Sequence, residues 1–143
     1  MSEALPFTLD PGDVVEAEPR LVLEDGAVFA CLDAAAALPP LLTVAWLSEP
    51  SGATLEGVVT EELARMDEES MLVDYEPVVL GGIEAGRTLH VHRDASGRLT
   101  ASEQWRLLAA GRRWTVSALT ALADQPTYGP RLAAVASSLR VVE

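Results

Sequence analysis

The residues best suited to chemistry are His90 and His92, the only two histidines of this 143-residue chain. They lie one residue apart in the segment TLHVHRD, and alternate residues of a β-strand point to the same side. The pair could therefore supply two ligands to a zinc ion, which needs three or four. Asp74 or Glu76, on an adjacent predicted strand, would have to supply the third. We expect two solvated histidines on a sheet face and keep a metal site at His90 and His92 as the alternative.

The hairpin that follows the histidines predicts what faces them. In LHVHRDASGRLTA, a three-residue loop at residues 95–97 ends in glycine, which favours the left-handed conformation at that position. This loop sets His92 opposite Thr100 and His90 opposite Ser102. Both cross-strand residues are poor zinc ligands, so the hairpin favours an ordinary strand face.

A second predicted hairpin, with its loop at residues 111–112, sets Leu107 opposite Val116 and Trp105 opposite Ala118. Large residues then meet small ones on one face, and polar residues share the other. The predicted packed face carries Leu89, Val91, Leu99, Ala101, Trp105, Leu107, Trp114 and Val116. The predicted solvated face carries His90, His92, Thr100, Ser102, Gln104, Arg106, Thr115 and Ser117. We predict that four residues of the solvated face contact a partner: Thr100, Ser102, Gln104 and Arg106.

The elements around these hairpins predict a single domain, residues 1–143, of the α+β class. Short alternating runs separated by Pro-Gly and Asp-Gly pairs indicate strands in the first third of the chain. Apolar residues at helical spacing in TLEGVVTEELARM and TYGPRLAAVASSL predict two main helices. We expect an antiparallel sheet of about six or more strands with both helices packed against it, as an αβα or αβ sandwich.

The charge of the chain disfavours two classes of partner. The formal net charge is -12, which disfavours binding to nucleic acid and to an anionic membrane surface. Residues 1–84 hold 18 of the 22 acids and two arginines, whereas residues 85–143 hold four acids and eight arginines. These halves are expected to balance each other within the domain, and a salt-sensitive homodimer is the alternative. The chain contains no lysine, so lysine Schiff-base and P-loop chemistry are excluded.

No sequence motif indicates catalysis or a cofactor. The lone cysteine, Cys31, lies in the apolar run AVFACLD and is expected to be buried and structural. A G-x-S-x-G nucleophile motif and a glycine-rich phosphate loop are both missing. The first residues, MSEALPF, do not read as a signal peptide, so we expect a cytoplasmic protein. We predict that the chain is not an enzyme and has no cofactor.

The last 60 or so residues resemble the PsbP-like α/β sandwiches, and within them the bacterial DcrB-like group. The similarity is carried by the segment GGIEAGR before a strand, the long hairpin GRLTASEQWRLLAAGRRWTVSALTA and the closing helix YGPRLAAVASSLRV. The resemblance implies an α/β sandwich that acts as a non-enzymatic partner of other proteins, and it implies no catalytic residues.

Together these features favour a non-catalytic cytoplasmic binding module, possible roles being an adaptor or a chaperone for a partner protein. Its contact surface would be the polar sheet face or an apolar groove beside it. The alternative is a protein that binds a small molecule or a metal through the strand face of His90 and His92.

Overall fold

A computed structural model of the chain describes residues 5–32, 39–49, 52–66 and 70–142. Within these ranges no helix is long and apolar enough to span a membrane. The elements follow in the order β1 (Phe7–Thr8), β2 (Leu21–Leu23), β3 (Gly26–Ala30), β4 (Leu41–Ser48), α1 (Leu55–Ala64), β5 (Ser70–Leu80), β6 (Ile83–Arg93), β7 (Leu99–Ala109), β8 (Arg112–Ala121), a 3₁₀ turn (Leu122–Asp124), α2 (Gln125–Ser137) and β9 (Arg140–Val141).

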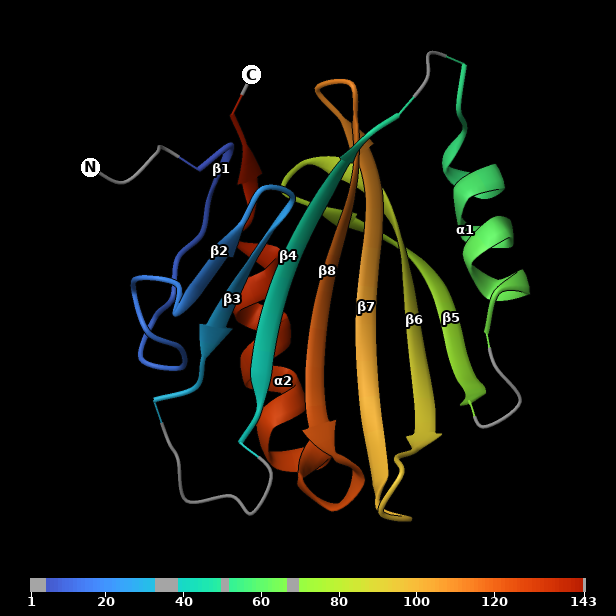
Figure 1. Cartoon of the computed structure of the whole chain (residues 1–143). Helices are drawn as coiled ribbons and strands as arrows, with labels where there is room; N and C mark the ends of the chain where they lie inside the picture. Colours follow the sequence, from blue (N-terminus) through green and yellow to red (C-terminus); the bar gives the residue numbers. More distant parts are fainter. Residues whose placement is uncertain (1–4, 33–38, 50–51, 67–69, 143) are drawn as a thin grey trace.

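Seven strands form one antiparallel sheet in the order β2-β3-β4-β8-β7-β6-β5, and β1 pairs with β9 in a small second sheet (Figure 1). Helix α2 lies behind the sheet in Figure 1 and packs on β8. Helix α1 contacts β6 and β7 from the opposite face. The predicted α+β class, with one antiparallel sheet between two helices, is confirmed.

The core lies between α2 and the sheet. Trp46 and Trp114 are cross-strand neighbours on β4 and β8, and their rings are 5.9 Å apart. Phe7 of β1 packs on both rings, so the small sheet closes one end of this core. Burial of large aromatic rings is the main source of stability in such a layer. The residues Trp105, Leu107 and Val116, predicted to face the core, are buried there as expected.

The two hairpins differ in how well their registers were predicted. His92 pairs with Thr100 and His90 with Ser102, as expected from the loop at residues 95–97. The β7–β8 pairing was predicted two residues out of register, because Leu107 lies opposite Trp114 rather than Val116.

The reason for that shift is the turn itself. Its two central residues are Ala110 and Gly111, with φ angles of 53° and 71°, a two-residue turn with both residues in the left-handed region. A shift of two residues leaves every side chain on its predicted face, since strand side chains alternate with a period of two.

The expectation that the polar face is open to water is wrong in part. Thr88, His90, Thr100 and Arg106 on that face are buried. The physical reason is α1, which lies over β6 and β7 and covers the polar residues between them. His90 is therefore a buried histidine and not a solvated one.

Candidate functional site

A pocket of about 330 Å³ lies between α1 and the polar face of the sheet. It brings together the two candidate metal ligands, His90 and His92, and the four residues predicted to contact a partner: Thr100, Ser102, Gln104 and Arg106. Its remaining wall comes from α1 and the residues after it, from the start of β5 and from β8: Glu62, Arg65, Met66, Ser70 and Leu119. The predicted strand face is thus one wall of a pocket that the sequence analysis did not anticipate.

Two features hold α1 over the sheet, and the first is a close approach at Gly86 of β6. Val58 and Val59 are the buried residues of α1, and a Cβ atom at residue 86 would lie 2.8 Å from Val59 Cγ2. The helix begins at Leu55 because the Thr54 hydroxyl accepts a hydrogen bond from the Gly57 amide at 3.1 Å, which caps the first turn. Glycine at residue 86 therefore lets α1 pack closely on β6, so that residues of α1 line one side of the pocket.

The second feature is a cluster of ion pairs around Arg113 of β8. Its guanidinium binds Glu49 through two hydrogen bonds of 3.1 and 2.9 Å and binds Glu62 of α1 at 3.1 Å. Glu61 lies 3.5 Å from it. The hydrogen bonds that Arg113 donates to Glu49 are the first cause of its raised pKa. These contacts pair the acidic first half of the chain with the basic second half, as the charge pattern predicted.

Arg106 of β7 is the most unusual group in the pocket. Its side chain is only 5% exposed, and Nε is buried with no hydrogen-bond partner. Nη1 donates to the Thr88 hydroxyl at 2.9 Å and Nη2 donates to Gln104 Oε1. None of the described carboxylates forms an ion pair with it. Burial lowers the pKa of Arg106, Glu62 acts against this and Arg113 adds to it.

Hydrogen bonds connect Arg106 to the rest of the wall. The Thr88 hydroxyl that accepts from Arg106 also lies 2.8 Å from Nε2 of His90. On the other side, Gln104 Nε2 donates to the Ser102 hydroxyl at 3.0 Å. The polar groups of β6 and β7 are therefore fixed in place before any ligand arrives, which reduces the entropy lost on binding.

Burial lowers the pKa of His90 from its ordinary value of 6.5, and the positive charge of Arg106 lowers it further. The imidazole is therefore neutral at neutral pH, and Nε2 can accept a hydrogen bond from Thr88. Arg106 is then the positive charge on the floor of the pocket. Thr88 itself was missed by the sequence analysis, although it alternates with His90 along β6 and so shares its face.

His92 lies nearer the start of β5. Its Nδ1 is 3.0 Å from the Ser70 hydroxyl, and its carbonyl oxygen accepts a hydrogen bond from Thr100 at 3.2 Å. Ser70 was also missed from the sequence, because its pairing with His92 depends on the β5–β6 register.

The suggestion that Asp74 or Glu76 completes a metal site with the histidines is wrong. A bulge between Leu72 and Asp74 shifts the β5–β6 pairing by one residue, which turns both acids to the opposite face. There they bind Arg87, at 3.0 Å for Asp74 and 3.4 Å for Glu76. Within the described residues, no three histidine, cysteine or acidic side chains converge as metal ligands.

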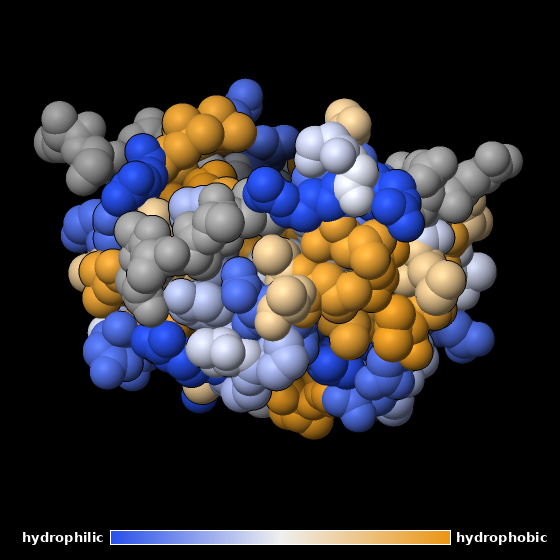
Figure 2. All heavy atoms as spheres, turned by 90° about the horizontal axis from the view of Figure 1, so that it is seen from below, coloured by the Kyte–Doolittle hydropathy of each residue, from blue (hydrophilic) through white to orange (hydrophobic). Residues whose placement is uncertain are grey.

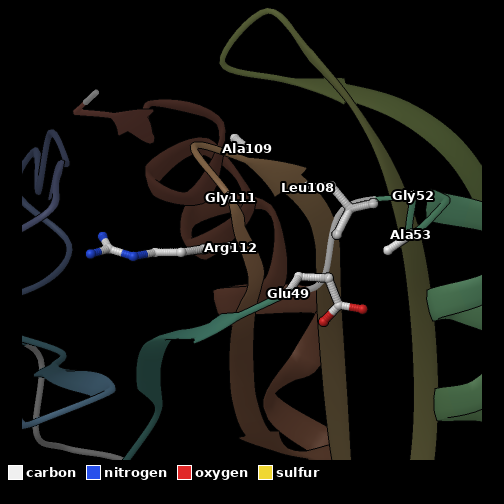
Figure 3. A pocket seen from close by; sticks show the side chains of 7 residues that line it. All are labelled: Glu49, Gly52, Ala53, Leu108, Ala109, Gly111 and Arg112. Carbon is white, nitrogen blue, oxygen red and sulfur yellow. The ribbon is translucent and has the colours of Figure 1, made fainter.

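Three other hollows of the described surface have no buried charged residue in their walls. One of about 260 Å³ lies at the opposite end of the sheet, between the β7–β8 turn and the segment before α1 (Figure 3). Figure 3 shows its Glu49 and Arg112 side chains pointing in different directions. Glu49 is already bound to Arg113, so its charge is satisfied. The pocket under α1 is therefore the stronger candidate site.

Comparison with known proteins shows a fold and no function. No protein-family model matches the chain, and no curated protein matches its sequence. A crystal structure of PA94, a protein of unknown function from Pseudomonas aeruginosa, superposes with a TM-score of 0.73 at 14% identity, covering 96% of this chain and 98% of that one.

Two further solved structures define the fold class. The solution structure of CyanoP, the PsbP protein of the cyanobacterium Synechocystis, matches with a TM-score of 0.57 at 18% identity over 95% of this chain and 82% of that one. LpqN of Mycobacterium tuberculosis, a protein involved in cell envelope biogenesis, matches with a TM-score of 0.58 at 15% identity over 96% and 91%. These likenesses confirm the expected sandwich: this chain has the PsbP-like fold.

Proposed function

We propose that this chain is a non-catalytic binding protein that holds a small molecule in the pocket between α1 and strands β6–β8. The observation that carries the proposal is the placement of Arg106, a buried guanidinium with unused donors, in the wall of a preformed pocket. Ligand sites are typically concave and contain a few fixed polar groups among apolar ones. Here Met66 and Leu119 supply apolar wall and Ser102 and Gln104 supply fixed polar groups.

For this pocket we prefer the small-molecule alternative to the protein adaptor. The residues predicted to contact a protein lie in a concavity under a helix, and Thr100 and Arg106 are buried. A flat protein surface cannot reach them, whereas a small ligand can. The cytoplasmic location remains a prediction from the sequence.

The contact that would most favour catalysis instead is the one between Ser70 and His92. A serine nucleophile needs a histidine base within hydrogen-bond reach, and this pair is 3.0 Å apart. The contact uses Nδ1, whereas in the serine protease triad the serine contacts Nε2 and an acid orients Nδ1. We therefore expect no labelling of Ser70 by a fluorophosphonate probe, and labelling that a Ser70→Ala variant abolishes would establish a nucleophile.

The binding proposal is tested by nuclear magnetic resonance. ¹⁵N-labelled protein is titrated with a library of polar compounds of low molecular mass. The expected result is a set of shifts confined to backbone amides of the pocket, such as those of His90, Ser102 and Gln104. Compounds that move only amides around the hollow of Figure 3, or no amides at all, would contradict the proposal.

A specific observation also supports a protein partner at a different surface. Strand β5 is an edge of the large sheet, and several of its large apolar residues are exposed, among them Met71 at 67% and Val79 at 69%. Figure 2, a view from below, shows apolar side chains gathered in patches between hydrophilic ones. An exposed edge strand can pair with an extended segment of another chain.

This second function is an adaptor that binds an extended peptide along β5. Its test is a Val79→Lys variant, in which a charge on the edge opposes strand addition, compared with an Arg131→Lys variant on α2. In a pull-down, a partner that is recovered with the wild type and with the Arg131→Lys control, but not with Val79→Lys, supports the adaptor. Equal recovery by all three proteins contradicts it.

A further inference from the structure

Three arginines of the sheet differ in whether carboxylates neutralise their charge. Arg87 and Arg113 are partly buried, and each binds three carboxylates: Asp74, Glu76 and Glu103 in the first case, and Glu49, Glu61 and Glu62 in the second. Arg106 is more deeply buried than either, and no described carboxylate contacts it. A buried charge without a counter-ion is costly, and this chain carries 22 acids from which one could have been placed there.

The guanidinium of Arg106 also has donors to spare. It carries five N–H groups, of which two bind Thr88 and Gln104 and one, on Nε, is buried and unpaired. The other two are on Nη1 and Nη2. Two adjacent Nη groups are the fork that binds an oxyanion through parallel hydrogen bonds.

We propose that the pocket under α1 binds a small monocarboxylate whose carboxylate group is the missing counter-ion of Arg106. This inference rests on the proposed function of the pocket as a ligand site and names the class of ligand. The carboxylate accepts hydrogen bonds from the Nη groups of Arg106, and the remainder of the ligand extends along β7 toward Ser102 and Thr100.

The charges around the pocket favour one negative charge over two. Arg106 supplies one positive charge, and the carboxylate of Glu62 is near enough to raise the pKa of Arg106 without pairing with it. Arg65, the other cation of the wall, already pairs with Glu61 at 2.7 Å. A phosphate dianion would therefore be opposed by Glu62 and left with half of its charge uncompensated.

The rest of the wall describes the rest of the ligand. Ser102 and Gln104 offer hydrogen bonds to a hydroxyl or amine group, and Met66 and Leu119 offer apolar contact to carbon. The volume of about 330 Å³ lies at the low end of the range for ligand pockets, roughly 300–1,000 Å³, and so suits a small organic acid. Short hydroxy acids fit this description.

The test compares matched pairs of probes on wild-type protein by isothermal titration calorimetry and by amide shifts. Glycolate, lactate and 3-hydroxybutyrate are each paired with the neutral amide, and inorganic phosphate is a separate arm. We expect the acids to bind about tenfold or more tightly than their amides, because a hydrogen bond to a charged group is stronger than one between neutral groups. Phosphate is expected to bind more weakly than the acids.

Variants assign the effect to Arg106. Arg106→Gln is expected to lower the affinity for the acid about tenfold or more and to leave the affinity for the amide nearly unchanged. Arg112→Gln is the matched control, since it changes the net charge equally but lies outside this pocket. If Arg106→Gln does not fold, the acid–amide comparison on wild-type protein still decides.

Each failure has its own signature. Amides that bind in the pocket as tightly as the acids, or phosphate that binds more tightly, would overturn the carboxylate inference and leave the binding function intact. Equal losses in Arg106→Gln and Arg112→Gln would also overturn it, because they would show general electrostatic attraction. If no probe moves the pocket amides, the monocarboxylate is overturned, and the wider library decides whether the binding function fails with it.

Discussion

Val59 of α1 rests directly on Gly86 of β6, so closely that a Cβ atom at residue 86 would lie 2.8 Å from the Val59 Cγ2 methyl group. This contact is where the helix and the polar face of the sheet meet. It makes the pocket depend on a residue that has no side chain of its own.

The first prediction therefore concerns Gly86→Ala. The added methyl group must push α1 outward, and we expect the free energy of unfolding to fall by about 1–3 kcal/mol, as for other overpacked sites. Urea denaturation measures the change. Gly26→Ala in β3 is the matched control, because its Cβ would meet Val44 O at an ordinary 3.6 Å.

A double variant tests whether the clash is the cause. Val59→Ala removes the methyl group that Gly86→Ala strikes, so the two changes together should destabilise less than the sum of the single changes. Additive losses of unfolding free energy would show that Gly86→Ala acts through strand propensity and not through the contact with α1.

The second prediction is that Arg113 contributes more to stability than an exposed arginine in an ion pair does. Arg113→Met removes a largely buried guanidinium from Glu49 and Glu62, and we expect the free energy of unfolding to fall by about 1–3 kcal/mol together with faster amide exchange in α1. Arg65→Met is the comparison, since its pair with Glu61 is exposed and worth at most about 0.5 kcal/mol. Equal effects would show that α1 is held by apolar packing alone.

The third prediction concerns the turn between β7 and β8. Ala110 has a φ of 53°, where residues other than glycine, asparagine or aspartate are strained. Ala110→Asn produces the Asn-Gly pair favoured by this kind of turn, and we expect a gain of about 0.5–1 kcal/mol in urea denaturation. Ala109→Asn, one residue earlier in the strand, should give no gain. A loss on Ala110→Asn would contradict the turn geometry.

The same turn shows what the sequence could and could not establish. Alternation placed the side chains of β7 and β8 on the right faces, because the error in register was two residues, a full strand period. At the bulge beside Val73 the strand alternation is interrupted, so faces cannot be assigned from the sequence in the same way. The metal hypothesis needed Asp74 or Glu76 beside the histidines, and the extra residue at the bulge sends both acids to the other face.

Part of the candidate site was predictable for the same reason. Alternation within β6 and β7, together with the register set by the loop at residues 95–97, brings six residues to one sheet face: His90, His92, Thr100, Ser102, Gln104 and Arg106. The apolar spacing in TLEGVVTEELARM predicted the helix, and two of its apolar residues, Val58 and Val59, are buried. It did not indicate that this stripe covers the polar face, since that depends on a contact with Gly86, which is 27 residues further along the chain than Val59. The burial of His90 and Arg106 follows from that contact.

The fourth prediction is a pH dependence that comes from His90. Its pKa in the folded protein lies below 6.5, because the ring is buried and Arg106 is near, whereas the unfolded chain has the ordinary value. Between these two pKa values the unfolded state binds more protons, so stability increases with pH. The contribution is complete above about pH 6.5 and is lost as the pH falls toward the folded pKa.

Urea denaturation of wild type and His90→Gln between pH 5 and pH 8 isolates this contribution. The other charged or ionisable side chains of the described pocket wall, including Glu62, Arg65 and His92, are the same in both proteins. The difference in unfolding free energy, wild type minus variant, should therefore decrease as the pH drops below 6.5. A difference that stays flat or increases would contradict the lowered pKa.

Direct titration of the His90 ring by nuclear magnetic resonance then separates the two causes of its lowered pKa, which are burial and the charge of Arg106. In Arg106→Gln the pKa should rise but stay below 6.5, since burial is the larger cause and remains. A carboxylate bound to Arg106 would offset the same positive charge without removing the side chain. Saturating lactate should therefore raise the pKa of His90 in wild-type protein, whereas lactamide should not. If neither compound changes the pKa of His90, the ligand does not bind at Arg106.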